Sequence, residues 1–174
     1  MVTVAIGERG LGGGLAAVLS KHVPGLDATA EVTAGSIANL QLIGGGKSEV
    51  GFTMADAAWD AYNGLDKFKD KKVPLRTLVV FYPNRMHVVT AEGKGIEKMT
   101  DLKGKRVATG APASGTEVMA MRLIEAFGMD PNKDVNRERL SLAESVNALK
   151  GFVHGIDGVI TEAAMEHATH RGLV

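Results

Sequence analysis

The sequence predicts an α/β fold in which parallel strands carry helices on their faces. Short apolar stretches that suit strands alternate with stretches whose apolar residues recur at helical spacing. Strands that alternate with helices in this way pair in parallel within one sheet. The alternation runs from Val2 to Tyr62 and starts again at Val107 after a stretch rich in turns. We therefore expect two lobes, residues 1–90 and residues 91–174, joined by a hinge.

The first series begins with a strand at Val2–Ile6. A glycine-rich loop, Gly7–Gly14, follows it and leads into a helix at Leu15–His22, which Pro24 and Gly25 stop. The same alternation predicts the next elements of the first lobe: a strand at 27–32, a helix at 36–43, a strand at 50–54, a helix at 56–62 and a strongly apolar strand at 75–82.

The second series follows Pro83, which breaks the apolar strand. A strand resumes at Met86–Thr90 and ends in the turn-forming residues 91–95. The remaining elements that we expect are a strand at 107, a helix from 116 that stops at 128, an extended segment at 139–142, a helix at 143–150, a strand at 155–160 and the start of a final helix at 162–170.

The turn between the strand at Val107 and the following helix is the best candidate for a binding loop. Ser114 or Thr116 can cap the helix, so its first free N–H groups point back into the loop. Such a loop binds carboxylate or phosphate oxygens, although an ordinary capped helix has the same pattern. Ligands of open parallel sheets bind beyond the carboxyl ends of the strands. Four loops are therefore expected to converge on one cavity: 7–14, 34–36, 54–56 and 111–116.

Four motifs in consistent order add a resemblance to a known family. They are KHVPGLDATAEVTAGSIANLQLI, GFTMADAAWDAYNG, DLKGKRVATGAPASGTEVMAMRLIEAFGMDP and LSLAESVNALKGFVHGIDGVI. Together they resemble the TAXI family of solute-binding proteins, the extracytoplasmic receptors of TRAP-type transporters. The resemblance implies a periplasmic-binding-protein-like fold of type II, with a ligand cleft between two lobes. It also implies a small carboxylate ligand such as glutamate or another amino or organic acid, a membrane permease as partner, and neither a cofactor nor a reaction.

The resemblance and the loops together select the candidate ligand-binding residues. Ser114, Gly115 and Thr116 are the expected carboxylate cradle. Arginine matches the geometry of a second carboxylate, and for this reason Arg9 and Arg85 are included. The other candidates are Gly7, Gly10, Ser36, Asn39, Asp56 and Tyr82.

The chain also departs from the family that it resembles. Its first loop is short and lacks aromatic residues, and Met54-Ala55 stands where the family tends to have Gln-Ser. Members of the family are longer and are secreted, so we expect a periplasmic protein whose signal peptide precedes the numbering, and either a fragment or an abbreviated relative. An abbreviated relative without ligand binding would expose apolar surface and associate.

An enzyme is the second functional class. Gly7, Gly10 and Gly12 follow the first strand, and Glu31 stands near the end of the second, which imitates a dinucleotide-binding fingerprint without its spacing. Ser114 has no base near it in sequence. The stretch GGGKS at residues 44–48 follows a helix and precedes a strand, the reverse of a phosphate-binding P-loop. No catalytic group is therefore expected.

Composition excludes several further classes of protein. Lys and Arg together number 20 and balance 20 Asp and Glu, so nothing favours nucleic acid as a partner. Cysteine is absent, which excludes disulfides and thiolate chemistry. No apolar run reaches the ~18 residues of a membrane span. Of the five histidines only His167 and His170 are close in sequence, without an evident third ligand, so no metal site is expected.

Overall fold

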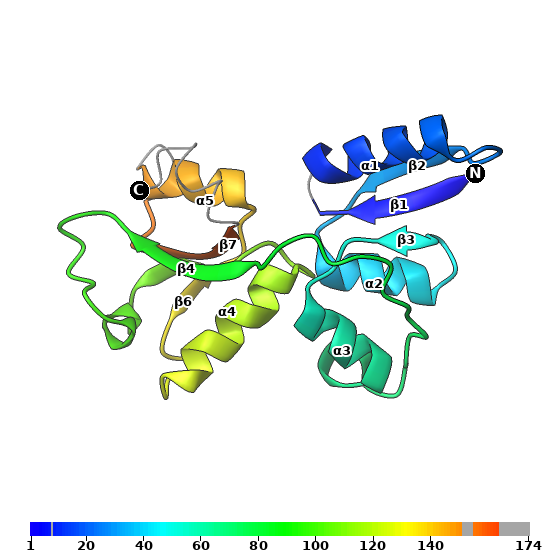
Figure 1. The fold of residues 1–174 in the computed structure, drawn as a ribbon. Coiled ribbons are helices and arrows are strands. Elements are labelled where there is room, and N and C mark those ends of the chain that lie inside the picture. The colour runs from blue at the N-terminus through cyan, green and yellow to red at the C-terminus, as the bar shows by residue number, and fades with distance from the viewer. Residues whose placement is uncertain (8, 151–154, 164–174) are drawn as a thin grey trace. The chain divides into compact units, whose positions relative to one another are not determined.

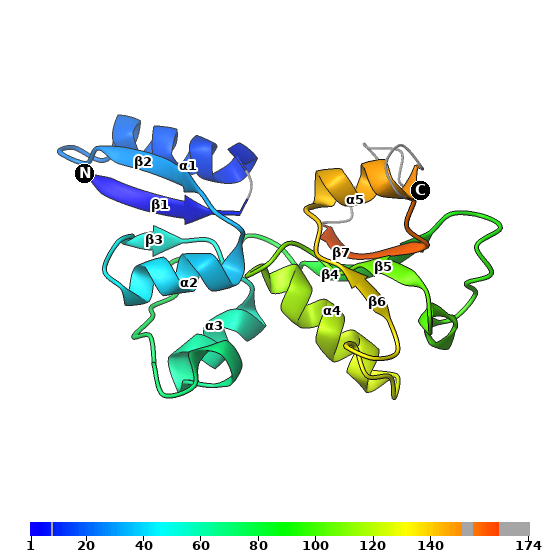
Figure 2. The ribbon, with the colours of Figure 1, turned by 180° about the vertical axis from the view of Figure 1, so that it is seen from behind.

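The computed structural model describes residues 1–7, 9–150 and 155–163, and it has the predicted α/β architecture (Figures 1 and 2). Contacts divide the chain into two compact units. The first is Met1–Val79 together with Ala113–Gly115, and the second is Val80–Pro112 together with the residues from Thr116 onward. The strand after residue 84 thus belongs to the second unit, and the division falls earlier than the expected boundary at residues 90 and 91.

The first unit is a three-stranded parallel sheet with helices. Its elements are β1 (Val2–Ile6), α1 (Arg9–His22), β2 (Ala28–Val32), α2 (Ser36–Gly44), β3 (Val50–Gly51), α3 (Ala55–Asn63) and the short 3₁₀ helix η1 (Asp66–Phe68). The strand order is β2-β1-β3, so the first strand is central. Val4, Ile6 and Ala16 form the buried cluster between β1 and α1. The parallel pairing confirms the prediction made from the alternation of strands and helices.

Helix α1 corrects the predicted glycine loop. The helix begins at Arg9, so Gly10 lies in its first turn, and residues 9–14 are helical instead of forming a loop. Gly12 shows the physical reason, because a Cβ atom there would lie 1.9 Å from Cγ2 of Ile6. The absence of a side chain lets the helix lie directly on β1. This packing outweighs the low helix propensity of glycine, which is about 1 kcal/mol less favourable than alanine.

The predicted strand at residues 75–82 is wrong. The structure places this segment in neither a strand nor a helix, and its large apolar side chains from Leu78 to Tyr82 are exposed. A strand exists only when a neighbouring strand satisfies its backbone N–H and C=O groups. High β-propensity alone therefore did not decide the outcome.

The second unit is a four-stranded mixed sheet in the order β4-β7-β5-β6. Its elements are β4 (Arg85–Thr90), the 3₁₀ helix η2 (Met99–Leu102), β5 (Arg106–Ala108), α4 (Gly115–Ala126), β6 (Asn136–Glu138), α5 (Leu142–Leu149) and β7 (Gly158–Ala163). Strand β7 runs antiparallel to β4 and parallel to β5. Val107 and Ala108 are consecutive on β5 and belong to two different buried clusters, as the pleat requires. The predicted parallel or mixed sheets are thus confirmed.

Several predicted bounds in the second unit are wrong. Strand β6 covers residues 136–138 and not 139–142, and β7 begins at Gly158 and not at Gly155. Residues 162 and 163 continue β7, where a helix was predicted, and the rest of that helix, like His154, His167 and His170, lies outside the described residues. The sequence Asn-Arg-Glu of β6 has no apolar residue because β6 is an edge strand, so periodicity could not reveal it.

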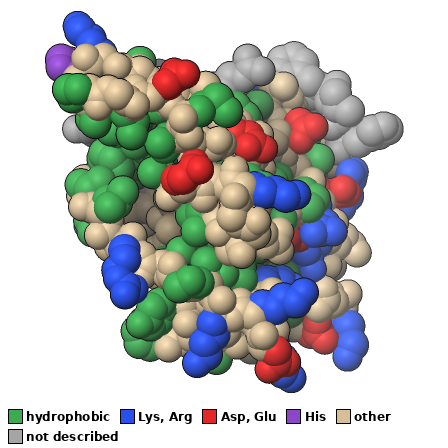
Figure 3. Space-filling view, turned by 90° about the vertical axis from the view of Figure 1, so that its right-hand side faces the viewer, with side chains coloured by type: hydrophobic (Ala, Val, Ile, Leu, Met, Phe, Trp, Pro, Cys, Tyr) green, Lys and Arg blue, Asp and Glu red, His purple; other side chains and the backbone are tan. Residues whose placement is uncertain are grey.

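The predicted helices at residues 36–43, 56–62 and 143–150 are confirmed within one or two residues at each end. No helix in the described part of the chain is long and apolar enough to cross a membrane. The face drawn in Figure 3 carries basic and acidic side chains side by side, in keeping with the formal net charge of zero.

Candidate ligand-binding site

The predicted convergence of loops is present within the first unit. Gly7 follows β1 directly. A Cβ atom on Gly7 would lie 3.0 Å from Cα of Gly35, which precedes α2. The N–H of Ala38 in α2 donates to the carbonyl of Ala113 at 3.2 Å. Ala113–Gly115, the loop before α4, therefore packs with the first unit, at the carboxyl end of its sheet. Segments far apart in the sequence thus meet where ligands of parallel sheets bind.

Glycine allows the closest approaches at this point. A Cβ atom on Gly115 would lie 2.7 Å from Sδ of Met54 and 2.8 Å from Oγ of Ser36. Gly35 has a φ of +123°, and a Cβ atom there would lie 3.5 Å from Ser114. The backbone of the loop before α4 therefore lies directly on the beginning of α2, with no side chain between them. We call Ser36, Met54, Ser114 and Gly115 the cradle.

Backbone strain marks the same loop. Ala113 has a φ of +62°, in the left-handed region that residues with a Cβ atom seldom adopt. Such a conformation is held in place only when the surroundings determine it, and it is found preferentially at ligand-binding and active sites. Here the hydrogen bond that the Ala113 carbonyl accepts from Ala38 holds it.

The helices that begin at the cradle lack side-chain caps. The residue before α2 is Gly35 and the residue before α3 is Met54, and neither forms a side-chain hydrogen bond to the helix. The first N–H groups of a helix have no acceptor within the helix, and they carry the positive end of its dipole. Two such ends meet here, because the Met54 N–H donates to Oγ of Ser36 at 3.1 Å. This arrangement favours a bound anion.

The two cradle serines are almost covered. Ser36 is 8% exposed and Ser114 is 7% exposed. Oγ of Ser36 accepts one hydrogen bond, from Met54, and a hydroxyl that accepts can still donate its proton. The Ser36 hydroxyl can therefore donate one hydrogen bond in addition to the one that it accepts.

Asn39 supports the site from beneath. It is 1% exposed, its Oδ1 accepts from the Thr33 hydroxyl, and its Nδ2 donates to the Phe52 carbonyl at 2.6 Å. Oγ1 of Thr33 in turn accepts from the Gly35 N–H at 3.0 Å. Both ends of the Asn39 amide are used within the unit, so the structure makes it a positioning residue. The sequence analysis did not select Thr33. The only sequence signal for it was its place two residues before Gly35, the glycine that precedes the helix.

The remaining candidates lie in different surroundings. Asp56 is in the first turn of α3 and partly exposed, and the side chain of Arg9 lies outside the described set. Thr116, Tyr82 and Arg85 belong to the second unit: Thr116 is in the first turn of α4, Tyr82 is 47% exposed, and Arg85 is the exposed first residue of β4. The structure thus groups Gly7, Ser36, Ser114 and Gly115, together with Met54, which the sequence did not suggest as a binding residue.

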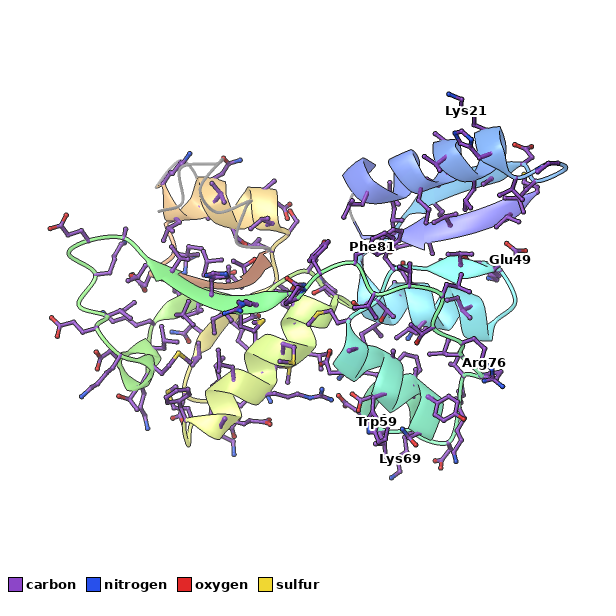
Figure 4. All side chains as sticks on the ribbon, viewed as in Figure 1. Lys21, Glu49, Trp59, Lys69, Arg76 and Phe81 are labelled. Carbon is purple, nitrogen blue, oxygen red and sulfur yellow. The ribbon has the colours of Figure 1, made fainter. Side chains whose placement is uncertain are left out.

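Trp59 does not pack in the core. It lies on α3 with 65% of its surface exposed and is labelled in Figure 4, whereas Asp60 beside it is 8% exposed. Helix α3 therefore presents its aromatic residue to solvent and its Asp60 to the interior of the unit.

A buried ion pair fixes the start of α4 within the second unit. Glu117 is in the first turn of α4 with its side chain 8% exposed, and its carboxylate accepts from Nη2 of Arg137 at 3.0 Å and from Nε of Arg139. The hydrogen bond to Glu117 raises the pKa of Arg139. Arg137 is the middle residue of β6 and Arg139 follows the strand directly, so these ion pairs tie α4 to that edge strand. Among the described residues, no group of three His, Asp or Glu side chains is arranged to hold a metal ion.

Comparison with known protein families identifies the family of the chain. The sequence pattern of the NMT1-like family matches residues 10–169. The chain belongs to the NMT1-like family. The matched range contains the cradle residues, the second sheet and every element of the first unit except β1 and the first residue of α1.

Solved structures of transport proteins share the fold. A putative L-cystine ABC transporter protein from Listeria monocytogenes is 18% identical over 97% of this chain and 72% of its own, with a TM-score of 0.63. A substrate-binding protein of an ABC uptake transporter from Streptococcus pneumoniae, with bound histidine, is 16% identical over 99% of this chain and 71% of its own, with a TM-score of 0.59.

The periplasmic aliphatic sulphonate binding protein SsuA from Escherichia coli is 17% identical over 97% of this chain, with a TM-score of 0.55. This chain spans only 56% of the length of SsuA. The fold is therefore that of periplasmic-binding-protein-like structures, as the resemblance implied.

Proposed function

We propose that the chain is an extracytoplasmic solute-binding protein that holds the anionic group of a small solute in the cradle. The observation that carries the proposal is that the beginnings of α2 and α3, which lack side-chain caps, meet the loop before α4. Backbone N–H groups and the Ser36 hydroxyl then neutralise an oxyanion without a charged side chain. The protein performs no reaction on its ligand and uses no cofactor.

A carboxylate is the proposed anionic group, and an α-amino acid is the proposed solute class. Asp56, in the first turn of α3, is suited to accept a hydrogen bond from a ligand ammonium group. Two of the similar structures support this solute class, since one is a putative L-cystine transporter protein and the other holds bound histidine. The sulphonate named for SsuA is also an oxyanion, so all three names fit one kind of binding group.

The proposed partner is a membrane permease of the TRAP type, and the proposed location is the periplasm. Support for this class of transporter comes from the motifs quoted from the sequence, above all DLKGKRVATGAPASGTE. The solved relatives are named for ABC transporters, which use the same kind of receptor. We favour the receptor over the dinucleotide-binding alternative, because Gly10 and Gly12 lie inside α1 and not in a loop after β1.

Calorimetric titration of the purified chain with amino acids, dicarboxylates, keto acids and sulphonates tests the proposal, with NADH as a control ligand. A ligand at 100 times its dissociation constant also adds about 2.7 kcal/mol to the free energy of unfolding, which a thermal melt detects. We expect one anionic class to bind and NADH to have no effect. A cooperatively folded protein that binds none of these anions would refute the proposal.

The variant Gly115→Ala locates the site. Its new methyl group would displace Ser36 and Met54, so we expect the affinity for the ligand to fall at least about tenfold, which corresponds to ~1.4 kcal/mol. Gly13→Ala is the matched control, since a Cβ atom there meets nothing within 4 Å. Equal loss of affinity in both variants, or in neither, would contradict the cradle assignment.

A further inference from the structure

The thioether of Met54 lies in the cradle, beside the groups that we assign to anion binding. A Cβ atom on Gly115 would lie 2.7 Å from Sδ of Met54 and 2.8 Å from Oγ of Ser36. The sulfur and the hydroxyl oxygen therefore lie around the same point next to the Gly115 backbone. Met54 also precedes α3 directly and is partly exposed. Its side chain thus borders the place proposed for the anionic group of the ligand.

The sulfur of Met54 adds nothing to anion binding itself. A thioether has no proton to donate and is only a weak acceptor. The N–H groups and the Ser36 hydroxyl can therefore hold an oxyanion without it. The distinctive chemistry of methionine is its oxidation to the sulfoxide, which turns an apolar side chain into a polar one and which reductases reverse.

We propose that Met54 is an oxidative modification site and that a hydroperoxide acting there turns anion binding off. The inference rests on the proposed function, because it concerns the same cradle. A lone pair of the sulfur attacks one oxygen of hydrogen peroxide, an S–O bond forms and the O–O bond breaks. The hydroxide that leaves takes the proton of the transferred oxygen and departs as water. Sulfur loses two electrons and the peroxide gains them, so no further reactant is needed.

The oxygen added to the sulfur would compete with the ligand. It is a polar acceptor with partial negative charge, so the donors that attract an oxyanion attract it as well. These donors are the Ser36 hydroxyl and the first N–H groups of α2 and α3. Because the oxygen is attached to residue 54, its effective concentration at these donors is high. Oxidation therefore fills the cradle from within and lowers its affinity for an external anion.

The same chemistry at another methionine should leave the cradle unchanged. Met99 is partly exposed, as Met54 is, but it packs against the core of the second unit. Any path that admits a solute to the cradle also admits hydrogen peroxide, which is smaller than an amino acid. Met54→Leu keeps the volume and apolar character of the side chain and removes the sulfur. Met99→Leu is the matched control.

Peptide mass mapping and hydrogen-exchange mass spectrometry after peroxide treatment test the inference without any ligand. We expect Met54 sulfoxide to form in the wild type and in Met99→Leu. Amide exchange of the peptides that contain Ser36 or Ser114 should then become slower, because the new oxygen accepts hydrogen bonds there. In treated Met54→Leu the exchange of these peptides should not change. Unchanged or faster exchange around oxidised Met54, or an oxidised wild type that no longer melts cooperatively, overturns the inference.

Calorimetric titration with L-glutamate, L-histidine and methanesulphonate before and after peroxide treatment measures the effect on binding. Oxidation should raise the dissociation constant of the wild type and of Met99→Leu at least about tenfold. It should leave Met54→Leu unchanged, and methionine sulfoxide reductases A and B together should restore the wild type. Full affinity with Met54 completely oxidised overturns the inference and leaves the proposed function intact. If the untreated chain binds none of the three probes, the proposed function is contradicted, and the exchange experiment still decides whether the sulfoxide occupies the cradle.

Discussion

Replacing Asn39 with alanine should destabilise the first unit by about 2–4 kcal/mol, a large part of the 5–15 kcal/mol typical of a domain. Asn39 is 1% exposed and makes two hydrogen bonds, one accepted from Thr33 and one donated to the Phe52 carbonyl. The Thr33 hydroxyl also lies 3.0 Å from the Ile6 carbonyl, so its proton keeps an acceptor in the variant. The Phe52 carbonyl, in contrast, loses its amide donor.

The magnitude follows from these two different consequences. A buried acceptor that loses its donor costs about 1–3 kcal/mol, whereas a hydrogen bond whose partner finds a substitute contributes about 1 kcal/mol. Urea denaturation followed by circular dichroism measures the sum as a shift of the midpoint at constant slope. Asn39→Asp should be at least as harmful, because a carboxylate oxygen would then face the Phe52 carbonyl oxygen.

Asn63→Ala is the matched control for this prediction. The Asn63 amide also donates to a carbonyl, that of Trp59 at 2.9 Å, but on the exposed end of α3. We expect its effect to stay within about 0.5 kcal/mol. If Asn39→Ala also stayed within that range, the amide would not position the loop before α2, and the reasoning from its hydrogen bonds would be refuted.

Two further predictions concern the packing of α1 and the response to acid. Gly12→Ala should destabilise the protein by about 1–3 kcal/mol despite the better helix propensity of alanine, because its methyl group would overlap Ile6. The pKa of Asp157 is lowered, mainly because its carboxylate accepts from the backbone N–H of Arg106 at 3.0 Å and also because of Lys94. The contribution of Asp157 to the free energy of unfolding is therefore present above pH ~4, and it is lost as the pH falls through the lowered pKa. Asp157→Asn should lower the free energy of unfolding at pH 7. It should also reduce the difference between the free energy of unfolding at pH 7 and that at acidic pH.

Matched variants check both of these predictions by chemical denaturation. Gly14→Ala places a methyl group where nothing lies within 4 Å, so it should stabilise the helix where Gly12→Ala destabilises it. Glu92→Gln removes an exposed carboxylate in a turn and should leave the pH dependence unchanged. Equal changes in stability in Gly12→Ala and Gly14→Ala would contradict the packing of Gly12 on Ile6. If Asp157→Asn left the dependence of stability on pH unchanged, the stabilising role of the Asp157 carboxylate would be refuted.

Much of the architecture and part of the candidate site follow from local pattern. The helices α2, α3 and α5 were predicted nearly to the residue, because apolar spacing and stop signals act over a few residues. Gly7, Ser36, Ser114 and Gly115 were predicted from their loops, since the carboxyl end of a parallel sheet is a known place for ligands. The sequence could not show that Asn39 uses both ends of its amide within the scaffold, because that depends on Thr33 and Phe52 being near it in space.

The sequence by itself determined the α/β class, the order of most helices and strands, and the loops that meet near Ser36. Only the tertiary structure decided where α1 begins, because the glycines become helical through the contact between Gly12 and Ile6. The same holds for β6, whose polar residues pair with β5, and for residues 75–82, which favour a strand but pair with no strand in the described part of the chain. Propensity and periodicity describe a residue and its neighbours in sequence, whereas the state of a strand or a glycine depends on what the folded chain places beside it.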